Sequence, residues 1–312
     1  MRIAFFGTPP PSVPYLRALI DAGHEVAAVV TQPDRPAGRG RTPTPSPVRV
    51  AAGQLGLPVL TPESASGDAF IVALDARRPR LGVVVAYGQI LRRTLLELPP
   101  AGFINVHYSL LPELRGAAPV YGALRRGLAS TGVTIQWMAL ELDAGDIMLQ
   151  RELAIGADDD RGTLTDRLTG IGVPLLLEAV ARIEAGAALR TPQDAAAATY
   201  VGRVTPDDCR IDWSAPADEV RRLVRACTPW PGAWCRLGGR RVKVQAVRVG
   251  QKLLSGEGSP GEIVEMPEGG GPLVRVGEGA VEIVRLQPEG RQPMSGAEFL
   301  RGARLAIDDR FE

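Results

Sequence analysis

The chain has 312 residues, of which 45% are hydrophobic and 23% charged, and its formal net charge at pH 7 is +1. This length favours two domains, and the composition excludes a disordered or fibrous chain. A net charge so close to zero identifies no acidic or basic partner. No apolar run reaches the roughly 18 residues of a membrane helix, and Met1–Gly7 is too short for a signal peptide. We therefore expect a cytoplasmic protein without a membrane partner. A monomer is our expectation for its oligomeric state, which the sequence does not itself reveal.

Strand-like and helix-like segments alternate in the first half of the chain. Apolar, β-rich runs predict strands at Arg2–Phe6, Glu25–Thr31, Leu81–Tyr87 and Phe103–His107, and Pro14–Ala22 reads as a helix. Strands that are apolar on both faces are typical of a parallel sheet covered by helices. The pattern predicts an α/β domain with a Rossmann-like, mostly parallel sheet, in which ligands bind beyond the carboxyl ends of the strands.

The later part of this domain continues with strands expected at Thr131–Leu140 and Ile147–Leu153 and a long amphipathic helix at Thr163–Glu184. The pattern then dissolves into Ala, Thr, Pro and Asp, which is typical of a linker. We assign residues 1–189 to the first domain and 190–207 to the linker.

Residues 208–312 have a different character. A helix expected at Ala217–Ala226 precedes short Val-rich segments separated by Gly and Pro, at Val242–Val249, Gly261–Val264, Leu273–Val276 and Val281–Leu286. Short strands at close spacing predict a small β-barrel or a sandwich.

Two features argue against common cofactors. Gly7 follows the first strand, but the next residues lack the second and third glycines that a dinucleotide-binding turn needs, so we expect a tight strand-to-helix turn. Cys209, Cys227 and Cys235 are odd in number and lack CxxC spacing, so we expect reduced, structural thiols and no metal site.

One of the two histidines of the chain ends a predicted strand. Asn105 and His107 lie two residues apart, so their side chains point to the same side of an extended strand. An Asn amide can donate a hydrogen bond to an oxyanion, and a His can move protons near neutral pH. The alternative is a structural, hydrogen-bonded histidine.

Asp143 and Asp146 flank Gly145 in a predicted turn between two strands. A carboxylate in this turn could reach back to His107 and orient its imidazole. The alternative is that both are ordinary turn-forming residues.

Four ordered motifs resemble the formyltransferases that use 10-formyltetrahydrofolate: Asn105-x-His107, Ser109–Pro112, Arg115–Pro119 and Asp143–Asp146. The resemblance implies catalytic roles for Asn105, His107 and Asp143 and no metal. Five further stretches are similar to the branch of this family whose acceptor is initiator methionyl-tRNA: Thr31–Gly40, Pro45–Val48, Val83–Gly88, Arg210–Trp213 and Pro229–Trp234.

The resemblance also implies a folate site. It places the co-substrate on Ser109, Leu110, Leu111 and Pro112, with walls from Val85, Tyr87, Gly88 and Ile90. A folate needs such an apolar slot with backbone hydrogen bonds. Tyr108 stands where the family more often has a small residue, and it could crowd or line this pocket.

An amine that attacks a formyl amide forms a tetrahedral oxyanion and loses a proton. We expect Asn105 and His107 to stabilise the oxyanion and Asp143 to orient His107. The proton acceptor stays open among His107, Asp143 and a bound water.

Basic residues gather locally although the whole chain is balanced. Residues 221–252 contain nine Lys or Arg and no Asp or Glu, and residues 31–49 contain four Arg against one Asp. With the resemblance, these stretches imply an OB-like tRNA-binding domain and a loop that contacts tRNA. The expected tRNA-binding residues are Arg35, Arg39, Arg41, Arg240, Arg241 and Lys243.

Without the resemblance, a solvated face explains residues 221–252 equally well, and a passive surface insertion is the favoured explanation of residues 31–49. Two rival functions are formyl transfer to a small amine, such as a glycinamide ribonucleotide or an amino sugar, and non-catalytic folate or RNA binding. The basic second domain argues against the first rival, and the intact set of Asn105, His107 and Asp143 argues against the second.

Overall fold

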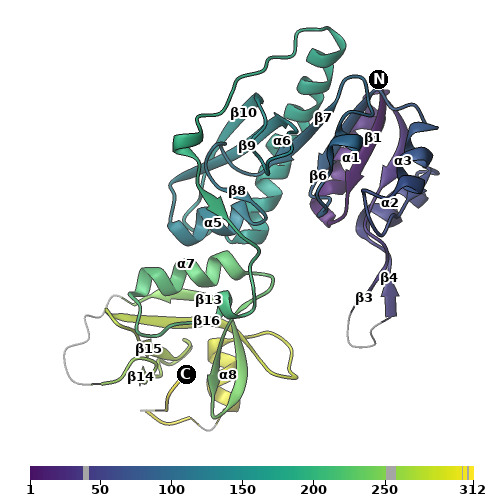
Figure 1. Cartoon of the computed structure of the whole chain (residues 1–312). Helices are drawn as coiled ribbons and strands as arrows, with labels where there is room; N and C mark the ends of the chain where they lie inside the picture. Colours follow the sequence, from purple (N-terminus) through teal and green to yellow (C-terminus); the bar gives the residue numbers. More distant parts are fainter. Residues whose placement is uncertain (38–41, 251–257, 304, 308) are drawn as a thin grey trace. The chain divides into compact units, whose positions relative to one another are not determined.

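The computed structural model describes residues 1–37, 42–250, 258–303, 305–307 and 309–312 (Figure 1). The chain divides into two compact units. The first comprises Met1–Pro119, Ser130–Ala154 and Thr165–Val201, and the second comprises Val120–Ala129, Ile155–Leu164 and Gly202–Glu312. The expected linker, residues 190–207, is thus divided between the two units after Val201.

The first unit is built on a seven-stranded sheet with the strand order β10-β9-β7-β6-β1-β2-β5. Its strands are β1 (Arg2–Gly7), β2 (Glu25–Val30), β5 (Val59–Leu60), β6 (Leu81–Val85), β7 (Phe103–His107), β9 (Ser130–Trp137) and β10 (Ile147–Ala154). The five strands from β5 to β7 are parallel to one another, and β9 and β10 form an antiparallel hairpin at the edge. The predicted mostly parallel α/β sheet is confirmed.

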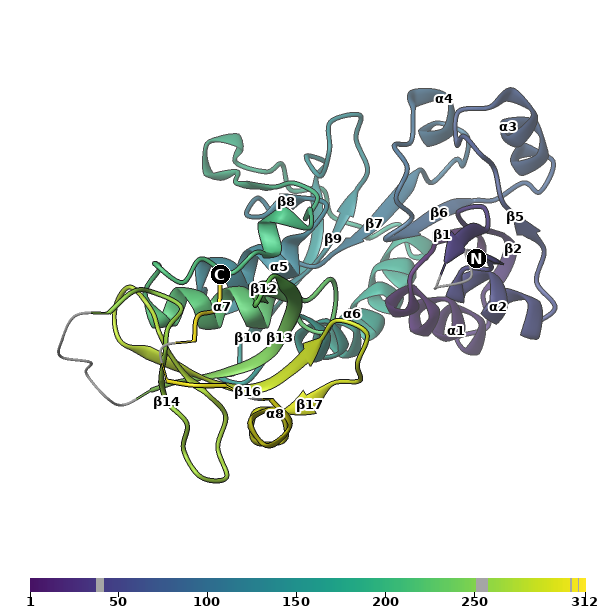
Figure 2. The same ribbon diagram turned by 90° about the horizontal axis from the view of Figure 1, so that it is seen from below.

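Helices cover both faces of this sheet. They are α1 (Val13–Asp21), α2 (Pro47–Gln54), α3 (Asp68–Asp75), α4 (Arg93–Leu96) and the larger part of α6 (Arg161–Glu184), with a 3-10 turn η1 (Pro10–Ser12) before α1. Helix α5 (Pro119–Arg126) from Val120 onward and α6 as far as Leu164 belong to the second unit. Figure 2 shows α3 and α4 on one side of the sheet and α1, α2 and α6 on the other. Phe6 of β1 packs with Phe70 of α3, Tyr87 and Phe103 in the core on the α3 side.

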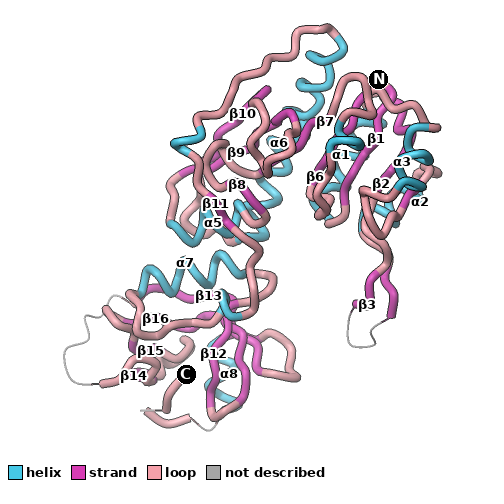
Figure 3. Tube along the Cα trace, in the orientation of Figure 1, coloured by secondary structure: helices cyan, strands magenta, loops and turns pink. Residues whose placement is uncertain are grey.

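Two short ribbons stand apart from the large sheet. Strands β3 (Arg35–Ala37) and β4 (Thr42–Thr44) pair with each other and project from the first unit (Figure 3). The expected tRNA-binding residues Arg39 and Arg41 fall between them and lie outside the described residues. Strand β8 (Arg115–Gly116) pairs in parallel with β11 (Tyr200–Val201), which follows the short turn η2 (Ala195–Ala197).

The second unit contains an antiparallel sheet with the order β12-β13-β16-β15-β14, and β17 pairs with β16. Its elements are η3 (Asp207–Cys209), α7 (Ala217–Cys227), β12 (Ala233–Leu237), β13 (Arg240–Val249), β14 (Ile263–Glu265), β15 (Leu273–Arg275), β16 (Ala280–Pro288), β17 (Met294–Ser295) and α8 (Gly296–Gly302). The last residues of the chain close this sheet, because Phe311 bridges to Leu237 of β12 and Arg310 bridges to Glu262 beside β14. The predicted small barrel is confirmed, and the sandwich alternative is wrong.

The three cysteines are free and fully buried in the core of the second unit. Burial raises the pKa of the Cys235 thiol to about 12, so this thiol stays protonated and poorly nucleophilic near neutral pH. Within the described residues, no cluster of three or more His, Cys, Asp or Glu side chains could hold a metal ion. In the same part of the chain, no helix is long and apolar enough to cross a membrane.

Candidate active site

The carboxyl end of β7 presents Asn105 and His107 on one side of the strand, with Val106 buried on the other. Asn105 lies between Val84 of the parallel strand β6 and Gln136 of the antiparallel strand β9. Only 6% of the His107 side chain is exposed, and Asn105 is half-buried. The sheet therefore places two polar side chains side by side at the carboxyl end of a central strand, as their spacing predicts.

The loop between β9 and β10 brings a carboxylate to the same place. Asp143 Oδ1 lies 3.7 Å from His107 Nδ1 and accepts a long hydrogen bond of 3.5 Å from Asn105 Nδ2. Gly145 lets the loop turn close to β9, because a Cβ atom at this residue would lie 1.7 Å from the carbonyl oxygen of Trp137. Asp146 points elsewhere and lies 3.9 Å from Arg190.

Two further donors fix the orientation of the Asp143 carboxylate. Its Oδ1 accepts from Gln136 Nε2 at 2.9 Å, and its Oδ2 accepts from the backbone N–H of Gly116 at 2.8 Å. Gly116 has φ of 111°, and a Cβ there would lie 2.3 Å from the carbonyl oxygen of Val201. Only glycine fits this close approach of β8 to β11.

The imidazole of His107 is held through its other nitrogen. Nε2 lies 2.9 Å from the carbonyl oxygen of Leu114 and, as the only possible donor of this pair, carries the proton. Leu114 itself has φ of 58°, an unfavourable left-handed conformation that aims its carbonyl at the histidine. Nδ1 is therefore the atom at which His107 can exchange a proton, and it faces Asp143.

The loop after β7, which contains the expected folate-binding residues Ser109 to Pro112, is tied to the sheet by a buried hydroxyl. Thr134 Oγ1 donates to the carbonyl of Ser109 at 2.6 Å and accepts from the backbone N–H of Leu111 at 3.1 Å. The Ser109 hydroxyl donates to the carbonyl of Glu113 at 2.6 Å, so it shapes the loop from within. Leu111 is buried, whereas Leu110 and Pro112 are half-buried.

The loop after β6 contains the other expected folate residues. Val85 and Tyr87 are buried, whereas Gly88 and Ile90 are exposed. The Tyr87 ring packs edge-on against Phe6 in the core, its hydroxyl has no hydrogen-bond partner among the described residues, and burial raises the pKa of Tyr87 to about 12. Its carbonyl oxygen accepts hydrogen bonds from Thr8 Oγ1 and Gln32 Nε2 at 3.0 and 3.2 Å. Tyr87 therefore anchors this loop to the core, and Gly88 and Ile90 are its residues at the surface.

Tyr108 does not face this side of the sheet. Its hydroxyl lies 2.7 Å from Thr169 Oγ1 of α6 and accepts from the Tyr15 hydroxyl of α1 at 3.2 Å. Residues alternate along an extended chain, so Tyr108 points away from Asn105 and His107. The effect of Tyr108 on the folate pocket stays a prediction.

Gln136 was not predicted, although a signal for it exists. It is a polar residue, only 2% exposed, in the largely apolar and fully buried segment VTIQW of β9. A buried amide needs hydrogen-bond partners, and Asp143 supplies one.

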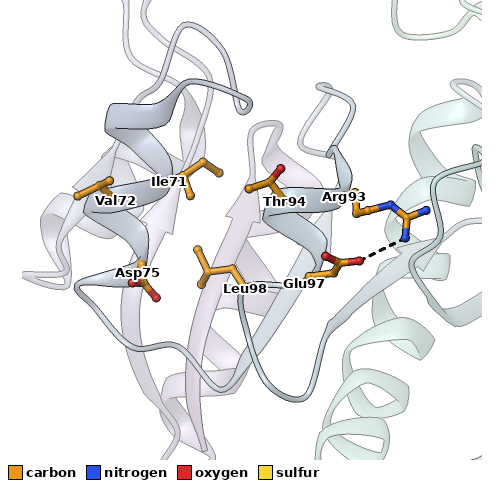
Figure 4. A pocket seen from close by; sticks show the side chains of 7 residues that line it. All are labelled: Ile71, Val72, Asp75, Arg93, Thr94, Glu97 and Leu98. Atoms are coloured by element: carbon orange, nitrogen blue, oxygen red, sulfur yellow. Dashed lines mark hydrogen bonds and ion pairs between the residues drawn. The ribbon is translucent and has the colours of Figure 1, made fainter.

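A separate surface pocket lies between α3 and α4 (Figure 4). It is lined by Ile71, Val72, Asp75, Arg93, Thr94, Glu97 and Leu98. An ion pair of 3.4 Å joins Arg93 to Glu97 at its rim. None of the residues predicted for catalysis or binding lines this pocket.

In the second unit, the β12–β13 hairpin presents cations and an aromatic ring on its outer face. Trp234 and Arg236 of β12 stand opposite Lys243 and Arg241 of β13, and the residues between them point into the core. The Arg241 guanidinium lies 4.2 Å from the Trp234 ring centroid, a cation–π contact. Arg240 is exposed at the start of β13.

The turn before β12 extends this surface. Lys243 Nζ donates to the carbonyl of Pro231 at 2.9 Å, and Arg161 Nη1 donates to the carbonyl of Trp230 at 2.9 Å. The Trp230 side chain is 67% exposed, with the Arg161 guanidinium 5.6 Å from its ring centroid. We call Arg161, Trp230, Trp234, Arg236, Arg241 and Lys243 the Arg–Trp surface. Arg35 of β3, in the first unit, is exposed and forms an ion pair with Glu63 at 3.0 Å.

Comparison with known proteins decides the family. The family model described as "Formyl transferase" matches residues 1–180, and the model described as "Formyl transferase, C-terminal domain" matches residues 203–304. The chain belongs to the formyl transferase family.

Relatives of the same length support this assignment. The chain is 46% identical over 305 residues to methionyl-tRNA formyltransferase of Dinoroseobacter shibae, covering 98% of each chain. It is 45% identical over 312 residues to methionyl-tRNA formyltransferase of Paracoccus denitrificans, covering 100% of each chain.

A solved structure shares the fold. HypX from Aquifex aeolicus, in complex with tetrahydrofolic acid, matches 96% of this chain with a TM-score of 0.68 and 20% identity. The chain spans about half the length of HypX, since 47% of that chain is covered.

We predict that Asn105→Ala and His107→Ala each lower kcat for formyl transfer on the order of 10²–10³-fold, the usual cost of losing one oxyanion donor. Steady-state rates measured alongside thermal unfolding check this. His24→Ala, which removes the other histidine, serves as the control with near-normal kcat. Near-normal turnover of either site variant would exclude that residue from catalysis.

Proposed function

We propose that this protein transfers the formyl group of 10-formyltetrahydrofolate to the α-amino group of methionyl-initiator tRNA, giving N-formylmethionyl-tRNA for translation initiation. One observation carries the proposal: the chain aligns end to end with methionyl-tRNA formyltransferases at 45–46% identity. The clustering of Asn105, His107 and Asp143 supports it, because this set suits acyl transfer to an amine.

The chemistry follows from the groups present. The amine nitrogen attacks the formyl carbon, a new C–N bond forms, and the bond from that carbon to N10 of the folate breaks. Asn105 Nδ2 and protonated His107 Nδ1 donate to the oxyanion of the tetrahedral intermediate. The amine loses a proton and N10 gains one, and the pair of His107 and Asp143 is placed to mediate this exchange.

We assign the folate co-substrate to the loops after β6 and β7. The exposed Gly88 and Ile90 and the half-buried Leu110 and Pro112 offer apolar contacts and backbone hydrogen bonds in the two loops that follow these neighbouring strands. Val85, Tyr87, Ser109 and Leu111 are buried and hold the shape of these two loops. No step of the reaction is routed through a metal.

We assign tRNA binding to Arg240, Arg241 and Lys243 in the barrel, to Arg35 of β3, and to Arg39 and Arg41, which follow β3 in the sequence. Closely spaced cations neutralise phosphates, and exposed aromatic rings stack on unpaired bases. The Arg–Trp surface combines both features, with Trp230 as its most exposed ring. Residues 1–189 then form the catalytic domain and residues 208–312 the tRNA-binding domain of a cytoplasmic monomer.

Transfer of labelled formyl from 10-formyltetrahydrofolate tests the proposed function. We predict acid-precipitable label on methionyl-initiator tRNA and none on the uncharged tRNA, since the acceptor is the methionyl amine. Glycinamide ribonucleotide and an amino sugar nucleotide serve as competing acceptors. Efficient transfer to either small amine without transfer to the charged tRNA would overturn the proposal.

For the Arg–Trp surface we predict that Arg241→Ala and Lys243→Ala each weaken tRNA binding and reduce the slope of log K against log salt by about 1, as expected for one lost phosphate contact. The KM for the folate should stay unchanged. Arg301→Ala on α8, a cation of the same domain outside this surface, is the matched control. Unchanged affinity and slope in both variants would remove the barrel face from the interface.

A further inference from the structure

We propose that Gln193 is a positioning residue for catalysis and that residues 189–201 form a strap over the catalytic domain. This inference rests on the proposed function, because it concerns the loop that carries Asp143. The sequence predicts a linker here, and most side chains from Thr191 to Ala197 are exposed, but Gln193 is half-buried.

The strap is attached to the first unit along its length. At its start, the carbonyl oxygen of Leu189 accepts a hydrogen bond of 2.9 Å from Trp137 Nε1. Thr191 pairs with Ile147 at the start of β10. Its last part, β11, pairs with β8, the strand whose Gly116 N–H binds Asp143.

The amide of Gln193 uses its full hydrogen-bonding capacity at the centre of the strap. Nε2 donates to the carbonyl of Asp143 at 2.8 Å and to the carbonyl of Gly145 at 2.7 Å. Oε1 accepts from Nε and Nη2 of Arg115 at 3.1 and 2.8 Å. These four bonds use both donors and both acceptor sites of a glutamine amide.

The two carbonyls that Gln193 holds belong to a strained loop. Asp143 has φ of 53°, a conformation that non-glycine residues adopt at a cost. Surrounding contacts must stabilise such a conformation for it to persist. Gln193 supplies two of these contacts on the backbone, while Gln136 and Gly116 bind the carboxylate.

Arg115 anchors the acceptor side of the same amide. Its side chain is only 3% exposed, and its Nη1 lies 3.2 Å from the Tyr200 hydroxyl of β11. The nearest carboxylate, Glu141, is 3.9 Å away on an exposed side chain. Arg115 therefore fixes the direction of the Gln193 amide. The amide N–H groups of Gln193 then face the carbonyl groups of the loop that contains Asp143.

Two substitutions separate positioning from simple anchoring. Gln193→Ala removes both halves of the amide. Gln193→Glu keeps an acceptor for Arg115, and strengthens that contact by charge, but replaces the two donors with a carboxylate that faces two carbonyl oxygens. If Gln193 only anchored Arg115, the glutamate variant would retain activity.

We expect Gln193→Ala to lower kcat about 10- to 100-fold, the scale of a misplacement near 1 Å, with KM for folate and tRNA within about twofold. Gln193→Glu should lower kcat at least as much. Thr191→Ala, an exposed residue of the same strap that pairs through its backbone, is the control with near-normal kcat. Hydrogen exchange of the peptide that spans residues 141–146 should be faster in both Gln193 variants.

A wild-type kcat in Gln193→Glu, or a loss confined to KM, would overturn the inference. If a variant unfolds, kcat and exchange are read from the other variant. The exchange measurement does not depend on the acceptor. If the wild-type protein fails to formylate charged tRNA, the proposed function fails, whereas unchanged exchange of the 141–146 loop defeats the role of Gln193 alone.

Discussion

The Asp143 carboxylate is the point on which the site depends. Four separate segments of the chain meet at this residue: β7 through Asn105 and His107, β8 through Gly116, β9 through Gln136, and the strap through Gln193. The partners of Asp143 come from four different parts of the sequence, so the carboxylate is held only when the whole domain has folded. The seven-stranded sheet makes the site possible by placing β9 antiparallel beside β7.

A carboxylate beside a histidine and an amide gives the site its chemistry. The imidazole can carry a second proton only at Nδ1, since Nε2 is bound to Leu114, and that proton would lie next to Asp143. The protein surrounds this pair with fixed hydrogen-bonding groups. Leu114 and Asp143 adopt unfavourable left-handed backbone conformations, which direct the Leu114 carbonyl and the Asp143 carboxylate toward His107. Such preorganised groups stabilise an oxyanion without rearrangement during the reaction.

Sequence patterns predicted the parts of the molecule that local periodicity encodes. The two-residue spacing of Asn105 and His107 placed both on one side of β7, and continuous apolar runs located the parallel strands β1, β2, β6 and β7. The two-residue strand β5 was not predicted, because it is too short to give a pattern. The approach of Asp143 to His107 followed from its turn together with the family resemblance. The barrel was left open against a sandwich, because its closure depends on Phe311 reaching β12 across the whole domain.

The contacts that periodicity could not encode are those made by side chains distant in sequence. Gln193 was assigned to a linker because the segment around it is rich in Ala, Thr, Pro and Asp, yet its amide is directed by Arg115, 78 residues away. Sequence patterns assigned no side to Tyr108, because the partners of its hydroxyl, Tyr15 and Thr169, come from two helices distant in sequence. Local pattern assigns a residue to a strand or loop, and only tertiary packing assigns its side chain a partner.

A double-mutant cycle on kcat tests the central claim that Asp143 acts through the groups it orders. His107→Ala, Asp143→Ala and the double variant are compared with the wild-type protein in formyl transfer, with folding of each checked by thermal unfolding. The account predicts strong non-additivity, with the double variant losing about as much as the more damaged single variant. Losses that add in free energy within about 0.5 kcal/mol would show that the two side chains act independently and would contradict it.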